Sequence, residues 1–152
     1  MSVTDEKNQV ITALLNGSIM SVRNSIPIQA NIGKPELFSN ALQFQFGVFI
    51  GITGDVRGKL VLSGDRQVFS RIGEAMFGMP IQDDMLVSLS GELGNIIAGG
   101  LSTNIGQNGM KTDITAPTIM EGITKLLGYD KVIRLPIGFQ AVGDLHLYLV
   151  ID

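Results

Sequence analysis

Ser88, Glu92 and Asn95 place a hydroxyl, a carboxylate and an amide at spacings that suit one face of a helix. If residues 84–105 are helical, at about 100° per residue these side chains and Gly99 fall within roughly 60° of one another. A side-chain amide offers one acceptor and two donors and does not titrate near neutrality, so it can hold a water molecule. An ionised carboxylate suits pairing with a cation. The pattern predicts a helix that presents an acid and an amide together.

The same segment has an apolar side and an unusual number of glycines. The apolar positions, which predict packing on a core, are Leu86, Leu89, Leu93, Ile96, Ile97 and Leu101. Four glycines, at 91, 94, 99 and 100, each cost about 0.8–1.0 kcal/mol relative to alanine in a helix interior. Gly99 shares the face of Asn95, so we expect a partner to approach there. Gly94 and Gly100 lie toward the apolar side, where they serve either such an approach or tight packing against the first helix.

The remaining segments predict the elements that position this helix. Helical spacing covers residues 5–24, and Asp65 is a candidate N-cap for a helix that runs through Phe77 to a terminating Gly78. Strand patterns cover residues 26–32, 44–53, 59–63, 113–121, 132–141 and 144–151. Pro117 lacks a backbone donor and is expected to shape a strand end beside the helix. We expect one α/β (α+β) domain over residues 1–152, with two long helices packed on a mostly antiparallel β-sheet.

A weak internal repeat runs through this order. The segment 52–55 leading into residues 59–62 is echoed by 141–144 leading into 146–149. Superposing the two long helices brings Asn16 onto Asn95 and Ala13 onto Glu92. If the repeat is not a chance similarity, the first half of the chain holds an incomplete copy of the site, which keeps the amide and lacks the acid.

Composition narrows the class of protein. The 152 residues carry a net charge of −3 with no cluster of Lys or Arg, which argues against nucleic-acid binding. There is no cysteine and no apolar stretch of membrane-spanning length, so we expect a cytoplasmic protein away from membranes. His146, the only histidine, lies in an alternating strand pattern, which leaves no basis for a serine triad or a histidine metal site. Residues 109–112 lack a preceding glycine at the distance that a phosphate-binding loop requires, and they follow a predicted helix rather than a strand.

The acid, amide and proline pattern is flanked by two further segments, Ile-Gly-Ile-Thr-Gly-Asp-Val-Arg-Gly at 50–58 and Asp-Ile-Thr-Ala-Pro-Thr at 113–118. Together they resemble the CheC/CheX/FliY family of phosphatases that act on phosphorylated CheY. The resemblance covers most of the chain, and the single-site form of this length is most similar to the CheX type. It implies a cytoplasmic α/β protein, often a homodimer, that dephosphorylates a receiver-domain aspartate in bacterial chemotaxis.

That substrate suggests a role for each residue of the pattern. Hydrolysis of an aspartyl phosphate chiefly requires a water held in line with the scissile bond, so we assign water positioning to Asn95. Glu92 would repel a phosphoryl group, and we expect it to grip a lysine of the partner instead. Ser88 either satisfies a nearby helix carbonyl or makes a minor partner contact. We expect no cofactor in this chain, and any Mg²⁺ to be supplied by the phosphorylated partner.

A second class of function fits the same face. A non-catalytic adaptor would bind a receiver domain or a flagellar-motor component through Glu92 without hydrolysing anything. The two hypotheses differ in turnover, because only an enzyme accelerates phosphate release when present in trace amounts.

Overall fold

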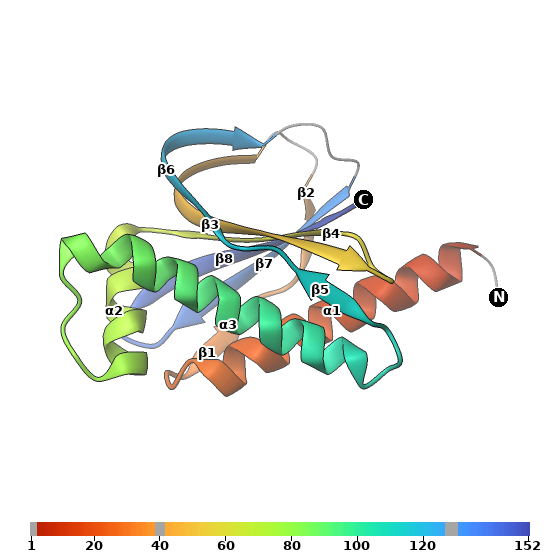
Figure 1. Cartoon of the computed structure of the whole chain (residues 1–152), viewed down its shortest axis with the longest axis horizontal. Coiled ribbons are helices and arrows are strands. Elements are labelled where there is room, and N and C mark those ends of the chain that lie inside the picture. Colours follow the sequence, from red (N-terminus) through yellow and green to blue (C-terminus); the bar gives the residue numbers. More distant parts are fainter. Residues whose placement is uncertain (1–2, 39–41, 127–130) are drawn as a thin grey trace.

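An antiparallel sheet is the centre of the computed structural model, which describes residues 3–38, 42–126 and 131–152 (Figure 1). The helices are α1 (Val3–Ser25), α2 (Arg66–Phe77), the short 3₁₀ helix η1 (Asp83–Met85) and α3 (Leu86–Gly106). The strands are β1 (Ala30–Ile32), β2 (Glu36–Phe38), β3 (Leu42–Gly54), β4 (Gly58–Gly64), β5 (Thr112–Ile114), β6 (Thr118–Leu126), β7 (Lys131–Phe139) and β8 (Gly143–Ile151). The predicted fold class, helices on an antiparallel sheet, is confirmed, with α2 as a third and shorter helix.

The strand pairing repeats between the two halves of the chain. The hairpin β3–β4 and the hairpin β7–β8 meet through β4 and β8. Strands β1 and β2 pair with β7, and strands β5 and β6 pair in the same way with β3. Exchanging α1–β4 for α3–β8 therefore reproduces every pairing, so the internal repeat is present in the topology. The sequence echo is out of register, however, because Gly54 ends β3 whereas Gly143 begins β8.

The helices cover one face of the sheet and bury the main core against it (Figure 1). From α3, the predicted apolar side contributes Leu93, Ile97 and Leu101, each at most 2% exposed. They pack in one cluster with Val48 and Ile50 of β3. Burying side chains of this size contributes about 1.5–3 kcal/mol each, which fixes α3 on the sheet and leaves its other side to solvent. None of the described helices combines the length and hydropathy that a bilayer crossing requires.

A second, smaller core lies on the opposite face, where β3 and β6 curl away from the helices (Figure 1). The register of β3 against β6 shifts between Phe44 and Phe46, and such an irregularity bends a strand. As a result Phe44 belongs to the second core, with its ring 5.3 Å from that of Tyr148, while Phe46 packs on Phe69 in the main core. The long strand β3 thus contributes to both sides.

Two expected strands differ substantially from the observed ones, and one observed strand was not expected. The strand expected over 113–121 is broken into β5 and β6, because Thr115 leaves the ladder to bond with Gly51. The Gly51 N–H donates to Thr115 Oγ1 at 2.9 Å, and the Thr115 N–H donates to the Gly51 carbonyl at 3.0 Å. The strand expected over 26–32 shortens to β1, because the Ile26 N–H still bonds to the Val22 carbonyl at the helix end. Strand β2 was not predicted.

Helix α2 begins and ends at the predicted residues. Asp65 is its N-cap in extended backbone conformation, although its side chain makes no capping hydrogen bond. Gly78 ends it at φ 69°, a left-handed conformation that glycine adopts without strain, and its N–H donates to the Glu74 carbonyl at 2.9 Å. The motif helix, expected from residue 84, is preceded by η1, so α3 itself starts at Leu86.

Candidate active site

The predicted acid and amide lie on α3, one turn apart and accessible. Glu92 and Ser88 are exposed, and Asn95 and Gly99 are half-buried. Neither Glu92 nor Asn95 makes a side-chain hydrogen bond or ion pair with any residue that the structure describes. The same holds for Ser88, so the alternative that its hydroxyl satisfies a nearby carbonyl finds no support. A stripe of unsatisfied polar groups therefore faces solvent on a rigid helix.

Two of the α3 glycines allow close packing inside the protein. A Cβ at Gly94 would lie 2.6 Å from Val48 Cγ1 and 3.0 Å from Ile50 Cδ1. A Cβ at Gly100 would overlap the side chain of Ser21 on α1. Gly100 thus serves the predicted packing of the two long helices, whereas Gly94 packs on β3 rather than on α1. The Ser21 hydroxyl uses this close approach to donate to the Ile97 carbonyl at 2.7 Å.

Gly91 brings Pro117 beside the acid. A Cβ at Gly91 would lie 3.4 Å from Pro117 Cγ and 3.6 Å from Ile119 Cδ1. Pro117 is half-buried and directly precedes β6, as expected of a residue that shapes a strand end. Pro117 therefore packs the start of β6 against α3 at Gly91, the residue before Glu92.

Gly99 differs from the other three glycines. Apart from its chain neighbours and the backbone of α3 itself, no heavy atom of the described residues lies within 4 Å of the position that its Cβ would occupy, so the protein's tertiary packing does not require a glycine there. A helix-interior glycine without a neighbour is costly unless something from outside uses the space. Gly99 is thus the position on the Asn95 face where a second molecule can come close to the helix backbone.

The equivalent face of α1 carries only part of this arrangement. Ser21 and Gly100, which contact each other across the helix pair, are 79 residues apart, the same separation that relates Asn16 to Asn95. Equivalent residues meet where two symmetry-related helices cross, so this contact supports the superposition. Asn16 is exposed, but the half-buried Ala13 stands where Glu92 would be, and Met20 stands at the position of Gly99, 49% exposed. The α1 face therefore lacks both the carboxylate of Glu92 and the glycine of position 99.

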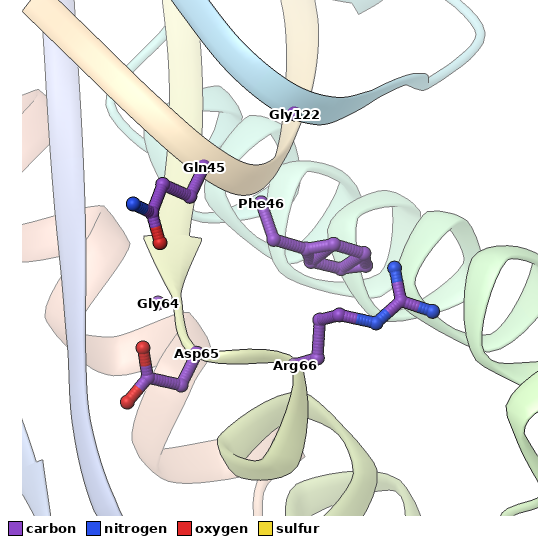
Figure 2. A pocket seen from close by; sticks show the side chains of 6 residues that line it. All are labelled: Gln45, Phe46, Gly64, Asp65, Arg66 and Gly122. Atoms are coloured by element: carbon purple, nitrogen blue, oxygen red, sulfur yellow. The ribbon is translucent and has the colours of Figure 1, made fainter.

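Sequence reasoning missed a cleft of about 410 Å³ between the curled part of β3, the start of α2 and β6 (Figure 2). Figure 2 shows Phe46 and Arg66 lining it side by side, and the Arg66 guanidinium lies 5.1 Å from the centre of the Phe46 ring. Arg66 Nη1 also pairs with Glu121 Oε1 at 2.8 Å. Among the described residues that line this cleft, Arg66 is the one cation and is already engaged, and none belongs to the α3 stripe. No signal in the sequence marked these residues as a group.

Comparison with known proteins decides the family. Residues 46–130, more than half of the chain and including Glu92, Asn95 and Pro117, match the family model described as "Chemotaxis phosphatase CheX". The chain belongs to the CheX family. The CheY-P phosphatase CheX of Thermotoga maritima is 30% identical over 146 residues, which cover 93% of this chain and 94% of that protein. The resemblance inferred from the sequence is therefore confirmed.

Solved structures of CheX and related proteins share the fold. A chemotaxis protein CheX from Desulfovibrio desulfuricans superposes with a TM-score of 0.79 at 20% identity, over 95% of this chain and 99% of that one. The CheX–CheY–BeF₃–Mg²⁺ complex from Borrelia burgdorferi matches with a TM-score of 0.76 at 21% identity, over 93% and 97%. FliY of Thermotoga maritima matches at 0.63 and 16% identity, over 92% and 84%. The CheX arrangement of helices on a sheet is thus common to this chain and to these proteins.

Proposed function

We propose that this CheX-family protein hydrolyses the aspartyl phosphate of a phosphorylated CheY-like receiver domain in bacterial chemotaxis, acting as a single domain over residues 1–152 in the cytoplasm. The Thermotoga relative is named a CheY-P phosphatase, and the Borrelia complex pairs a CheX with CheY. The observation that carries the proposal is the free acid and amide on α3, one turn apart, beside a glycine with open space.

Asn95 supplies the hydrolytic step by positioning. Its amide oxygen accepts a hydrogen bond from a water, and its NH₂ group faces a phosphoryl oxygen of the bound receiver. The water oxygen attacks phosphorus in line, the bond from phosphorus to the aspartyl oxygen breaks, and the electron pair leaves with the receiver's carboxylate. The water's protons pass to the released inorganic phosphate and to solvent. Such a reaction needs alignment and charge stabilisation more than covalent help from the enzyme.

Glu92 holds the partner. It is exposed and is in no ion pair with a described residue, so its carboxylate is available to a lysine of the receiver. An ion pair across the interface fixes orientation and assists encounter. The contact extends along α3 in both directions. One turn before Glu92, Ser88 offers its free hydroxyl. One turn after Asn95, Gly99 offers backbone that no side chain covers.

The phosphorylated receiver brings the metal that the reaction uses. No group of three His, Asp or Glu side chains in the described part of the chain is arranged to hold a metal ion. The Borrelia complex contains Mg²⁺ together with CheY and BeF₃, a stand-in for the phosphoryl group. Mg²⁺ prefers carboxylates plus phosphate oxygens, which a phosphorylated receiver offers and the α3 stripe does not.

Two copies of the chain associate through the outer strand β2. Among the described strands β2 pairs only with β7, so its second edge is open. Leu37 on this strand is 75% exposed, and an exposed apolar residue on an open edge favours pairing with another chain. A symmetric edge-to-edge contact would join two sheets.

The deciding experiment measures phosphate release from phosphorylated CheY with a trace amount of this protein. Wild-type protein is expected to accelerate release through many turnovers, and Asn95→Ala to abolish the acceleration while binding is retained. Asn16→Ala is the matched control, because it removes an exposed amide at the equivalent position of α1 and should change nothing. Wild-type rates in Asn95→Ala would refute the role of this amide. Binding without turnover by the wild-type protein would identify an adaptor instead.

A further inference from the structure

The face of α3 that carries Asn95 continues to the end of the helix. Gly106 lies eleven residues beyond Asn95, which places it about 16 Å further along the axis and roughly 20° around it. As at Gly99, a Cβ built on Gly106 would have no heavy atom from another described part of the protein within 4 Å. The stripe that begins at Ser88 therefore ends in a second glycine with open space beside it.

A cleft of about 580 Å³ opens at this end of α3, against the β3–β4 turn and β5. Its walls are held by hydrogen bonds within the protein. The Lys111 N–H donates to Asp55 Oδ2 at 2.8 Å, and the Asp55 N–H donates to the Lys111 carbonyl at 2.9 Å. Across the cleft floor, the hydroxyls of Ser102 and Thr112 lie 2.7 Å apart. The cleft is therefore formed before any partner binds.

The charges around the cleft favour a cation. Among the described residues, Asp55 and Asp113 both line it, and Lys111 is the only basic residue that does. Asp113 and Lys111 are exposed, and neither side chain is in an ion pair with a described residue. The C-terminal end of α3 adds the partial negative charge of the helix dipole. The negative charge of two carboxylates and a helix C-terminus therefore exceeds the positive charge of the single Lys111 ammonium group, so the cleft is negative overall.

We infer that this cleft receives a basic segment of the same receiver domain whose phosphoryl group lies at Asn95. The inference rests on the proposed function. A protein interface of ordinary size covers about 800 Å² per partner, which corresponds to a radius of about 16 Å around its centre. A receiver centred on Asn95 therefore reaches Gly106 and the cleft along the face of α3 that also carries Gly99 and Ser102. A contact this far from phosphorus binds the substrate and the transition state equally, so it acts on KM and not on kcat.

The test uses two substitutions in the full-length protein. Gly106→Trp fills the cleft without meeting any atom near the Cβ position, and Asp113→Lys reverses its free carboxylate. Gly106→Trp is expected to raise KM for phosphorylated CheY about tenfold with kcat within about twofold. Asp113→Lys should raise KM about threefold at low salt, with a smaller effect at high ionic strength. Gln107→Trp is the matched control, since it adds the same bulk one residue on, about 100° around the helix and outside the cleft.

The outcomes separate this inference from the proposed function. Unchanged KM in both variants, with wild-type turnover intact, would overturn the cleft contact and leave the phosphatase proposal standing. An equal rise in KM in Gln107→Trp would also overturn the cleft contact, because added bulk outside the cleft would then have the same effect as bulk inside it. A wild-type protein without turnover would refute the proposed function itself. If Gly106→Trp melts below the wild-type temperature, Asp113→Lys and its salt dependence decide the matter.

Discussion

Replacing Gly99 by alanine should make the protein more stable. The new methyl group meets no described heavy atom within 4 Å outside its own helix turn, and no positive φ is recorded there, so only the helix propensity changes. Alanine is favoured over glycine in a helix interior by about 0.8–1.0 kcal/mol. In a domain of this size that gain raises the melting temperature by about 2–4 °C.

The same substitution at Gly94 should have the opposite effect, which makes it the internal comparison. Its methyl group would lie 2.6 Å from Val48 Cγ1 and 3.0 Å from Ile50 Cδ1, both in the main core. Overpacking of this kind costs about 1–3 kcal/mol, more than the propensity gain returns. Gly94→Ala should therefore melt below the wild-type protein while Gly99→Ala melts above it.

Substitutions at Gly99 that do not destabilise the protein should still lower its activity. A larger side chain there occupies the space by which the receiver approaches Asn95, so Gly99→Leu should lower kcat/KM about tenfold, equal to about 1.4 kcal/mol. Thermal melting followed by circular dichroism and phosphate release from phosphorylated CheY are measured on the same preparations. A Gly99→Ala protein that melts below wild type would show that the position is packed. A Gly99→Leu protein with wild-type kcat/KM would show that no partner comes near it.

Three further changes test separate parts of the structure. Glu92→Gln keeps the size of the side chain and removes its charge, so KM for phosphorylated CheY should rise about tenfold at low salt with kcat little changed; identical KM values would exclude an ion pair there. Ser21→Ala removes the 2.7 Å bond to the Ile97 carbonyl at the helix crossing and should cost about 1 kcal/mol in urea unfolding; an unchanged midpoint would assign this crossing to apolar packing alone. Leu37→Lys puts a charge on the open edge of β2 and should give a monomer in light scattering at a concentration where the wild-type protein is a dimer. Equal masses for the two proteins would place any dimer contact elsewhere.

The elements that were predicted correctly are those whose signals are local. Asp65 and Gly78 bound α2 because the conformations at helix ends depend on neighbouring residues alone. The α3 stripe followed from the spacing of Ser88, Glu92 and Asn95, since the geometry of one helix converts sequence distance into angle. The family resemblance, in turn, depended on short segments that lie beside this helix.

The features that were missed depend on contacts between distant segments. Strand β2 has three residues and exists because Glu36, Leu37 and Phe38 pair with β7, almost a hundred residues away. The break before Pro117 depends on the bonds between Thr115 and Gly51, and no spacing along the chain reveals them. The glycines of α3 were recognised as sites of close approach, but the sequence does not say that Gly94 meets β3 and Gly100 meets α1. The cleft beyond Gly106 was missed for the same reason, although Asp55 and Asp113 lie in the two segments that carried the resemblance.

The symmetric pairing of the strands has a consequence for how the chain folds. The outer strands β1 and β2 attach to β7, and β5 and β6 attach to β3, so each half completes the sheet of the other. Neither half can bury its hairpin alone, in contrast to two tandem domains that fold one after the other. Nearly all of the chain must leave the ribosome before the first strands find their neighbours, and such high contact order slows folding. A gene duplication that produced this fold would have been viable from the start only if the single copies already exchanged strands as an intertwined pair.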